Sequence, residues 1–478
     1  MQFILSQNSE NLLSIAENNN EIESSVDENF QKYLMLVDAH ELIQKKLVDS
    51  LNYYNKISNK NYVLTGKDIK NLSISFSKRI ALLNETINFA DRSNGLNFDK
   101  VFNNLIATHL KIKALETYLI QQDIVAKNAK INNLVNEENK LYRQEKNSLK
   151  KIKRNIISRK YRRSILEAWN NTNVFERNTL NEIKNRNIKS NIVITAYHKN
   201  YLSNSTNIKK SKIYFRNLID KKNSFYAKVN FNNFINTIFS GFSNVVSNFL
   251  GIFASRKGKL SNNEEFINRS LKLLQPLDII LEKTPFRLTD KFIPGYWGHA
   301  AIYIGNEAQL KKLGIWDNIF VKKFHVQISK GNVIIEALRS KVELNTFKNF
   351  SNIDDYAHLR LNEELTLEKK REMIIRTFAQ IGKKYDFGYD VESSKKIICS
   401  ELHYITFDEV VFKTSKFMGI NSVSVDQIAE QGLKGGAFYP IDLYLDSIKI
   451  EEDKIIELYE LLPKARNKEI RKLKKSLH

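Results

Sequence analysis

The single cysteine of this chain and a histidine 100 residues before it are the side chains best suited to covalent chemistry. Cys399 stands in KKIICSELHYITF, where a β-prone run at residues 396–398 precedes a stretch that predicts a helix. Cys399 is therefore expected at a helix N-terminus, where unpaired backbone N–H groups and the helix dipole favour the thiolate over the thiol. A thiolate in this position can attack a carbonyl carbon.

A nucleophilic thiol needs a base, and His299 is the best placed of the eight histidines. It lies in the apolar strand WGHAAIYIG, whose small neighbours leave room beside the imidazole. The next apolar strand, NVIIEALRS, carries Glu336 where further core residues are expected. A carboxylate in such a strand needs a partner, so Glu336 is our candidate for orienting His299. The sequence leaves other groups open for this role, namely water or the carboxylates of Glu343, Asp354 and Asp355.

A resemblance to a known family is carried by three stretches: LQPLDIILEKTPFRLTDKFIPGYWGHAAIYIG, VIIEALRSKVELNTF and GKKYDFGYDVESSKKIICSELHYITF. They resemble the circularly permuted, papain-like cysteine hydrolases of the NlpC superfamily, specifically the YiiX/YebB-like group, over roughly residues 270–450. In that group the histidine strand comes before the nucleophile helix, as it does here. The resemblance implies that Cys399 is the nucleophile, His299 the base and Glu336 the orienting residue. It also places Tyr385 and Asp386 in the site, and we assign substrate binding to Tyr385, Asp386, Trp297 and Ser400.

The predicted function is thiol-dependent hydrolysis at an amide or ester carbonyl through an acyl-enzyme. The family spans peptidase-like, amidase-like and acyl-transferring activities, so the resemblance does not choose a substrate. Two rival functions remain: a membrane-associated lipid acyl hydrolase or acyltransferase, similar to the lecithin:retinol acyltransferase-like enzymes, and a non-catalytic binding scaffold. In the scaffold, Cys399 is an ordinary buried residue and His299 a core histidine.

No metal or cofactor is expected. His403 lies four residues after Cys399, so the two side chains share a helix face and resemble a metal-binding pair. A zinc site needs three or four protein ligands, however, and the chain has no second cysteine.

The turn-forming residues divide the chain. All five prolines and 11 of the 16 glycines come after residue 275, whereas the first half has few turn formers and apolar residues at helical spacing. We therefore predict an α+β protein in which a long all-α N-terminal domain precedes a permuted papain-like domain with an antiparallel sheet. The predicted parts are an α-helical bundle, an amphipathic connecting helix, the hydrolase domain and a basic tail, at residues 1–228, 229–260, 261–463 and 464–478.

The formal charge of +22 is concentrated in two blocks. Residues 143–163 carry ten Lys or Arg against one acid, and residues 464–475 carry seven against one. Few aromatic residues accompany them, so nucleic acid is not the expected partner.

Residues 229–253 combine a Phe-rich stripe from Phe231 to Phe253 with an uncharged polar face. This pattern predicts either a helix in the interface of an anionic membrane or one packed between the domains.

The N-terminal residues lack the basic region and the apolar length of a secretory signal. We therefore expect a cytoplasmic chain, with peripheral membrane association as an alternative, and the sequence leaves export without a cleavable signal open. The expected partners are a peptide, amide or acyl-lipid substrate and an anionic membrane surface.

Overall fold

The structure is a computed structural model that describes residues 28–57, 59, 62–92, 100–158, 161, 256–286, 295–338, 340–386, 397–417 and 420–462, together with 470, 473, 474 and 476. The described residues fall into two compact units. The second unit contains residues 63–71, residues 139–141 and all described residues from 256 onward, and the remainder form the first unit.

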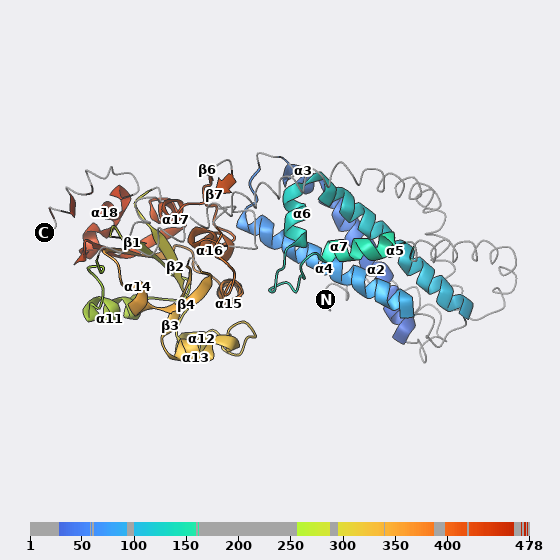
Figure 1. Ribbon diagram of the computed structural model, residues 1–478, viewed down its shortest axis with the longest axis horizontal. Coiled ribbons are helices and arrows are strands. Elements are labelled where there is room, and N and C mark those ends of the chain that lie inside the picture. Colours follow the sequence, from blue (N-terminus) through green and yellow to red (C-terminus); the bar gives the residue numbers. More distant parts are fainter. Residues whose placement is uncertain are drawn as a thin grey trace. The chain divides into compact units, whose positions relative to one another are not determined.

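The regular elements described in the first unit are all helices, in agreement with the predicted all-α region (Figure 1). Its helices are α2 (Glu28–Asp49), α3 (Leu51–Ile57), α4 (Gly66–Arg92), α5 (Lys100–Lys127), α6 (Ala129–Asn136) and α7 (Ser148–Ile157), of which α4 begins in residues of the second unit. Apolar side chains of α2, α4 and α5 form one core, among them Tyr33, Leu82 and Leu110. Within this bundle, His40 is fully buried and its two ring nitrogens lie 2.7 and 2.8 Å from the hydroxyls of Thr117 and Thr86.

The second unit is built on an antiparallel sheet with the strand order β4-β3-β2-β1-β5-β8-β9. The strands are β1 (Ile279–Lys283), β2 (His299–Tyr303), β3 (Asn332–Ala337), β4 (Val342–Thr346), β5 (Asp355–Leu361), β8 (Phe438–Leu445) and β9 (Ile448–Lys449). A separate hairpin pairs β6 (Ser415–Phe417) with β7 (Ile420–Ser422). The antiparallel sheet agrees with the predicted α+β class.

Helices of the second unit pack around this sheet (Figure 1). They are α11 (Glu264–Leu273), α12 (Glu307–Lys312), α13 (His325–Ser329), α14 (Phe347–Phe350), α15 (Leu367–Phe378), α16 (Cys399–Thr406), α17 (Val425–Ala429) and α18 (Ile455–Leu461), with 3-10 turns η3 (Lys322–Phe324), η4 (Glu430–Gly432) and η5 (Glu452–Lys454). Helix α16 contacts β2, β3, α15 and α17.

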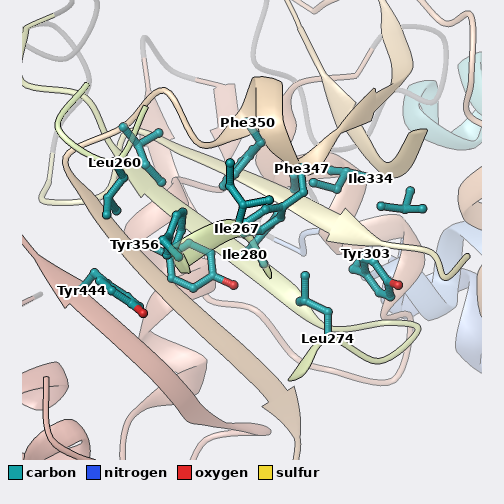
Figure 2. Packing of buried hydrophobic residues seen from close by; sticks show 14 residues of the cluster. Leu260, Ile267, Leu274, Ile280, Tyr303, Ile334, Phe347, Phe350, Tyr356 and Tyr444 are labelled. Atoms are coloured by element: carbon teal, nitrogen blue, oxygen red, sulfur yellow. The ribbon is translucent and has the colours of Figure 1, made fainter. Parts of the chain in front are cut away.

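One face of the sheet is covered by α11 and α14. Figure 2 shows Ile267 and Phe347 of these helices packed against Ile280, Tyr303 and Tyr356 of the strands. The ring of Phe266 meets the rings of Phe347, Tyr356 and Tyr444 at centroid distances of 5.5, 5.1 and 4.8 Å. Edge-on aromatic contacts of this kind add to the area that the core buries, so they fix the strands beneath the two helices.

The strand ends that matter for chemistry meet at one edge of the sheet. β1 ends at Lys283, which pairs with Asp355 at the start of β5, and Glu282 pairs with His299 at the start of β2. β3 is antiparallel to β2, so its last residues, Glu336 and Ala337, lie at the same edge. Residues that are far apart in the chain, such as Lys283 and Asp355, are thereby brought together.

A lysine from the basic tail is anchored at this edge. The Nζ atom of Lys474 lies 2.7 and 2.5 Å from the two carboxylate oxygens of Asp355, which is fully buried. The same carboxylate accepts hydrogen bonds from the hydroxyl of Tyr296 at 2.5 Å and from the backbone N–H of Asp446 at 2.6 Å. A buried carboxylate needs such partners because an unpaired charge is costly in a protein interior. Part of the predicted basic tail is therefore packed against the second unit.

The predicted interfacial helix, residues 229–253, lies outside the described residues. Within the parts of the chain that the structure describes, no helix has the length and apolar character needed to cross a membrane.

Replacing Lys474 with methionine should destabilise the second unit by roughly 3 kcal/mol, because Asp355 would keep a buried charge without its cation. This loss of stability lies at the lower end of the range for broken buried ion pairs, because the Lys474 side chain is 18% exposed. Urea unfolding followed by tryptophan fluorescence measures the change. The matched control is Lys454→Met, which removes a lysine that is 56% exposed beside Glu451 and should have little effect. Equal midpoints for the two variants would show that the Lys474 contact contributes no stability.

Candidate active site

Cys399 is the first residue of α16, as the sequence predicts. Its side chain is 7% exposed and the thiol is free. The preceding residues do not form a regular strand; instead, Ile397 exchanges backbone hydrogen bonds with Lys384 and Asp386, at 3.0 and 3.4 Å. The Glu401 carboxylate accepts a hydrogen bond from the Ile398 N–H at 3.0 Å, which satisfies one donor at the start of the helix.

His299 and Glu336 lie in direct contact. The Nε2 atom of His299 is 2.8 Å from Oε2 of Glu336, and the two side chains are 15% and 4% exposed. The other oxygen, Oε1, accepts a hydrogen bond from the amide of Asn345 on β4 at 2.6 Å. Because Nε2 is engaged by Glu336, Nδ1 is the imidazole nitrogen left for the thiol of Cys399, with which His299 forms a hydrogen bond. The three residues predicted to act together are thus neighbours.

The electrostatic surroundings favour a protonated His299. Burial alone lowers the pKa of this imidazole, but the Cys399 thiolate, the hydrogen bonds to Cys399 and Glu336 and the charge of Glu282 outweigh it, and the pKa lies well above its ordinary value. The proton of the pair therefore sits on the imidazole when the sulfur is ionised. An imidazolium beside a thiolate is the arrangement that cysteine hydrolases use for attack and for protonation of the leaving group.

His403 lies between helix α16 and strand β2 and contacts the backbone of both. Its Nδ1 lies 2.8 Å from the carbonyl oxygen of Cys399, one turn earlier, and its Nε2 lies 3.4 Å from the carbonyl oxygen of Ala301 on β2. The side chain is fully buried. Burial lowers the pKa of His403 to about 4, and the hydrogen bonds to the two carbonyls oppose this shift only in part. Both ring nitrogens of His403 thus face carbonyl oxygens, and the neutral imidazole can donate a hydrogen bond to one of them.

Asp426 holds the turn that leads into the histidine strand. Its two carboxylate oxygens accept hydrogen bonds from the backbone N–H groups of Tyr296 and Trp297, at 2.7 and 2.8 Å. Gly295 precedes them with a φ of +106°, and a Cβ atom there would lie 2.0 Å from Asp426. Only glycine fits this turn without displacing the carboxylate. These two hydrogen bonds fix the backbone of Tyr296 and Trp297 just before His299.

The four residues assigned to substrate binding differ in their surroundings. Trp297 is fully buried, Asp386 is 6% exposed and Tyr385 is partly exposed, whereas Ser400 is buried and its hydroxyl donates to the Val423 carbonyl at 2.6 Å. Residues 387–396, between Asp386 and the nucleophile helix, lie outside the described residues. Substrate binding by these four side chains stays a prediction.

The alternative orienting carboxylates have other partners. Asp354 pairs with Arg256 at 2.5 Å, Asp355 with Lys474, and Glu343 lies 3.7 Å from Lys341. The contact with His299 belongs to Glu336. Among the described residues, no group of three or more His, Cys, Asp or Glu side chains is arranged to hold a metal ion.

Sequence reasoning missed three contributors, namely Asn345, Asp426 and Glu282. An asparagine in a strand and an aspartate opening a short helix carry no local signal of a role at a distant site. Glu282 offered a weak one, since it interrupts the apolar strand IILEK in the same way that Glu336 interrupts NVIIEA.

Comparison with protein families identifies the C-terminal domain. Residues 274–439 match the family described as permuted papain-like amidase enzyme, YaeF/YiiX, C92 family. Comparisons with curated proteins and with solved structures give no match. The matched segment contains Cys399, His299 and Glu336.

The pKa of His403 predicts a pH dependence of stability. This histidine is protonated at about pH 6.5 when unfolded but only at about pH 4 when folded, so its contribution is complete above pH 6.5 and is lost as the pH falls toward 4. The loss amounts to about 3 kcal/mol over that interval. Urea unfolding of the wild type and of His403→Gln, whose amide keeps a neutral donor, measures it: the wild type should lose more stability between pH 6.5 and 4. Parallel curves for both proteins would contradict the assignment.

Proposed function

We propose that this chain, whose residues 274–439 form a permuted papain-like domain of the amidase family, is a cysteine hydrolase that acts on an amide or ester carbonyl through an acyl-enzyme. The observation that carries the proposal is the contact of His299 with Glu336 on one side and Cys399 on the other. This set provides a nucleophile, a proton carrier and an anion that orients it, all at one edge of the sheet.

Acylation begins with the Cys399 thiolate attacking the carbonyl carbon. The new C–S bond moves the π electrons of the carbonyl onto its oxygen, and backbone N–H groups in the first turn of α16 can stabilise that charge. The carbonyl double bond then forms again, and the bond to the leaving group breaks. The His299 imidazolium donates its proton to the departing amine or alcohol, which leaves a thioester on Cys399 and a neutral imidazole.

In deacylation the same histidine first accepts a proton instead of donating one. Neutral His299 removes a proton from an incoming water, the resulting hydroxide attacks the thioester carbon, and the C–S bond breaks to release the acid and the thiolate. Glu336 keeps its contact with Nε2 through both steps, so the imidazole presents the same nitrogen to the reacting atoms.

Of the functions open to this fold, the buried charge arrangement favours catalysis over a binding scaffold. A scaffold gains nothing from a carboxylate–imidazole–thiol set whose assembly requires desolvated charges. The lipid-directed alternative depends on residues 229–253, which lie outside the described residues. The amide or ester hydrolase is therefore the function that we put forward.

The test uses p-nitrophenyl acetate, an activated ester that reports acylation of any reactive thiol. The wild type should release a burst of p-nitrophenol of about one equivalent per chain, and Cys399→Ala should release none. His299→Ala should slow the burst at least ~100-fold because the proton carrier is lost. Glu336→Gln should slow it roughly 10-fold, the loss expected for a hydrogen bond to a charged group.

Two matched variants control this experiment. His325→Ala removes a histidine of the same domain that stacks on Trp316 at a centroid distance of 3.8 Å, and Glu343→Gln changes the carboxylate opposite Glu336 on β4. Both should react like the wild type. A burst that survives in Cys399→Ala, or that is unaffected in His299→Ala, would overturn the proposed function.

A further inference from the structure

Asn345 lies where it can control the orientation of Glu336. It belongs to β4, the strand next to β3, and pairs across the strands with Ile334, two residues before Glu336 on the same face. Its Nδ2 atom lies 2.6 Å from Oε1 of Glu336, whose Oε2 meets His299 at 2.8 Å. The carboxylate of Glu336 therefore contacts His299 through one oxygen and Asn345 through the other.

Its neighbours fix which end of the Asn345 amide faces Glu336. Oδ1 accepts a hydrogen bond from the backbone N–H of Thr346 at 2.8 Å and another from the side-chain amide of Asn349 at 2.9 Å. A backbone N–H can only donate, so the atom that it meets must be the oxygen. The NH₂ group is thus directed at Glu336 and the amide cannot flip without losing these contacts.

A neutral donor suits this position better than a charged one. Glu336 helps to raise the pKa of His299, and a lysine or arginine in contact with Glu336 would cancel much of that effect. An aspartate at position 345 would place two carboxylates in contact and raise the pKa of one of them. An asparagine amide orients Glu336 while leaving its negative charge available to the imidazole.

We propose that Asn345 is a positioning residue of the active site, which holds Glu336 so that Oε2 stays on His299 and the imidazole stays directed at Cys399. The inference rests on the proposed function, because it assigns Asn345 a role through Glu336 and His299. Asn349 extends the same line of hydrogen bonds toward the surface, where its side chain is exposed.

The test measures alkylation of Cys399, the only thiol of the chain, by iodoacetamide as a function of pH. Asn345→Ala should slow alkylation near pH 7 roughly 10-fold, since a hydrogen bond to a charged group is lost. Asn345→Asp should be slower still, and its deficit should grow as the pH rises and both carboxylates ionise. Asn349→Ala, which removes one of the two donors to Oδ1, should give a smaller loss in the same direction.

A double-variant comparison separates positioning from a general structural effect. In the Glu336→Ala background, Asn345→Ala should cause no further loss, because the group through which it acts is gone. The matched control is Asn332→Ala, which removes an asparagine on β3 whose amide donates to the Gln327 carbonyl at 2.8 Å, and it should leave alkylation unchanged.

The outcomes distinguish this inference from the proposed function. If Asn345→Ala alkylates like the wild type while His299→Ala and Glu336→Gln are slow, the positioning role is wrong and the proposed function stands. An equal loss from Asn345→Ala with and without Glu336 also contradicts positioning through Glu336. If His299→Ala alkylates like the wild type, the proposed function itself fails.

Discussion

The site depends on the burial of ionisable groups that can be tolerated only together. His299, Glu336 and Cys399 have little exposed surface, and each would be costly to bury in its charged form alone. Burial lowers the affinity of the imidazole for its proton, but the contacts with Cys399 and Glu336 raise it by more, so the pKa of His299 lies well above its ordinary value. The start of β2, the end of β3 and the start of α16 must therefore meet accurately. A displacement of one partner would leave the others with unpaired charge.

Several contacts outside these three side chains supply that accuracy. Asp426 fixes the turn before His299, and His403 lies between the carbonyl of Cys399 and the neighbouring strand. Lys474 neutralises Asp355, whose carboxylate also holds the hydroxyl of Tyr296 in that turn. Elements from both ends of the domain thus support the same edge of the sheet. Since His299 and Cys399 are far apart in the chain, these long-range contacts must form before the site is complete.

The sequence was sufficient to identify the residues whose type is unusual in its setting. A lone cysteine before a helix, a histidine beside small residues in a strand and a glutamate ending an apolar strand each stand out locally, and the structure brings these three together. The roles of Asn345 and Asp426 could not be predicted, because each is defined by a partner in a distant segment rather than by its neighbours. The contact of Lys474 could not be predicted for the same reason, since only the fold reveals the buried Asp355 that it meets.

The proposed function requires an ion pair between Cys399 and His299, and titration of His299 by NMR tests this requirement most directly. The measurement compares the imidazole of His299 in the wild type and in Cys399→Ala, with Glu336 present in both. The thiolate raises the pKa of His299, so its removal should lower that pKa and move the titration to lower pH. The same titration curve in both proteins would show that the sulfur carries no charge beside His299, and the account would be wrong.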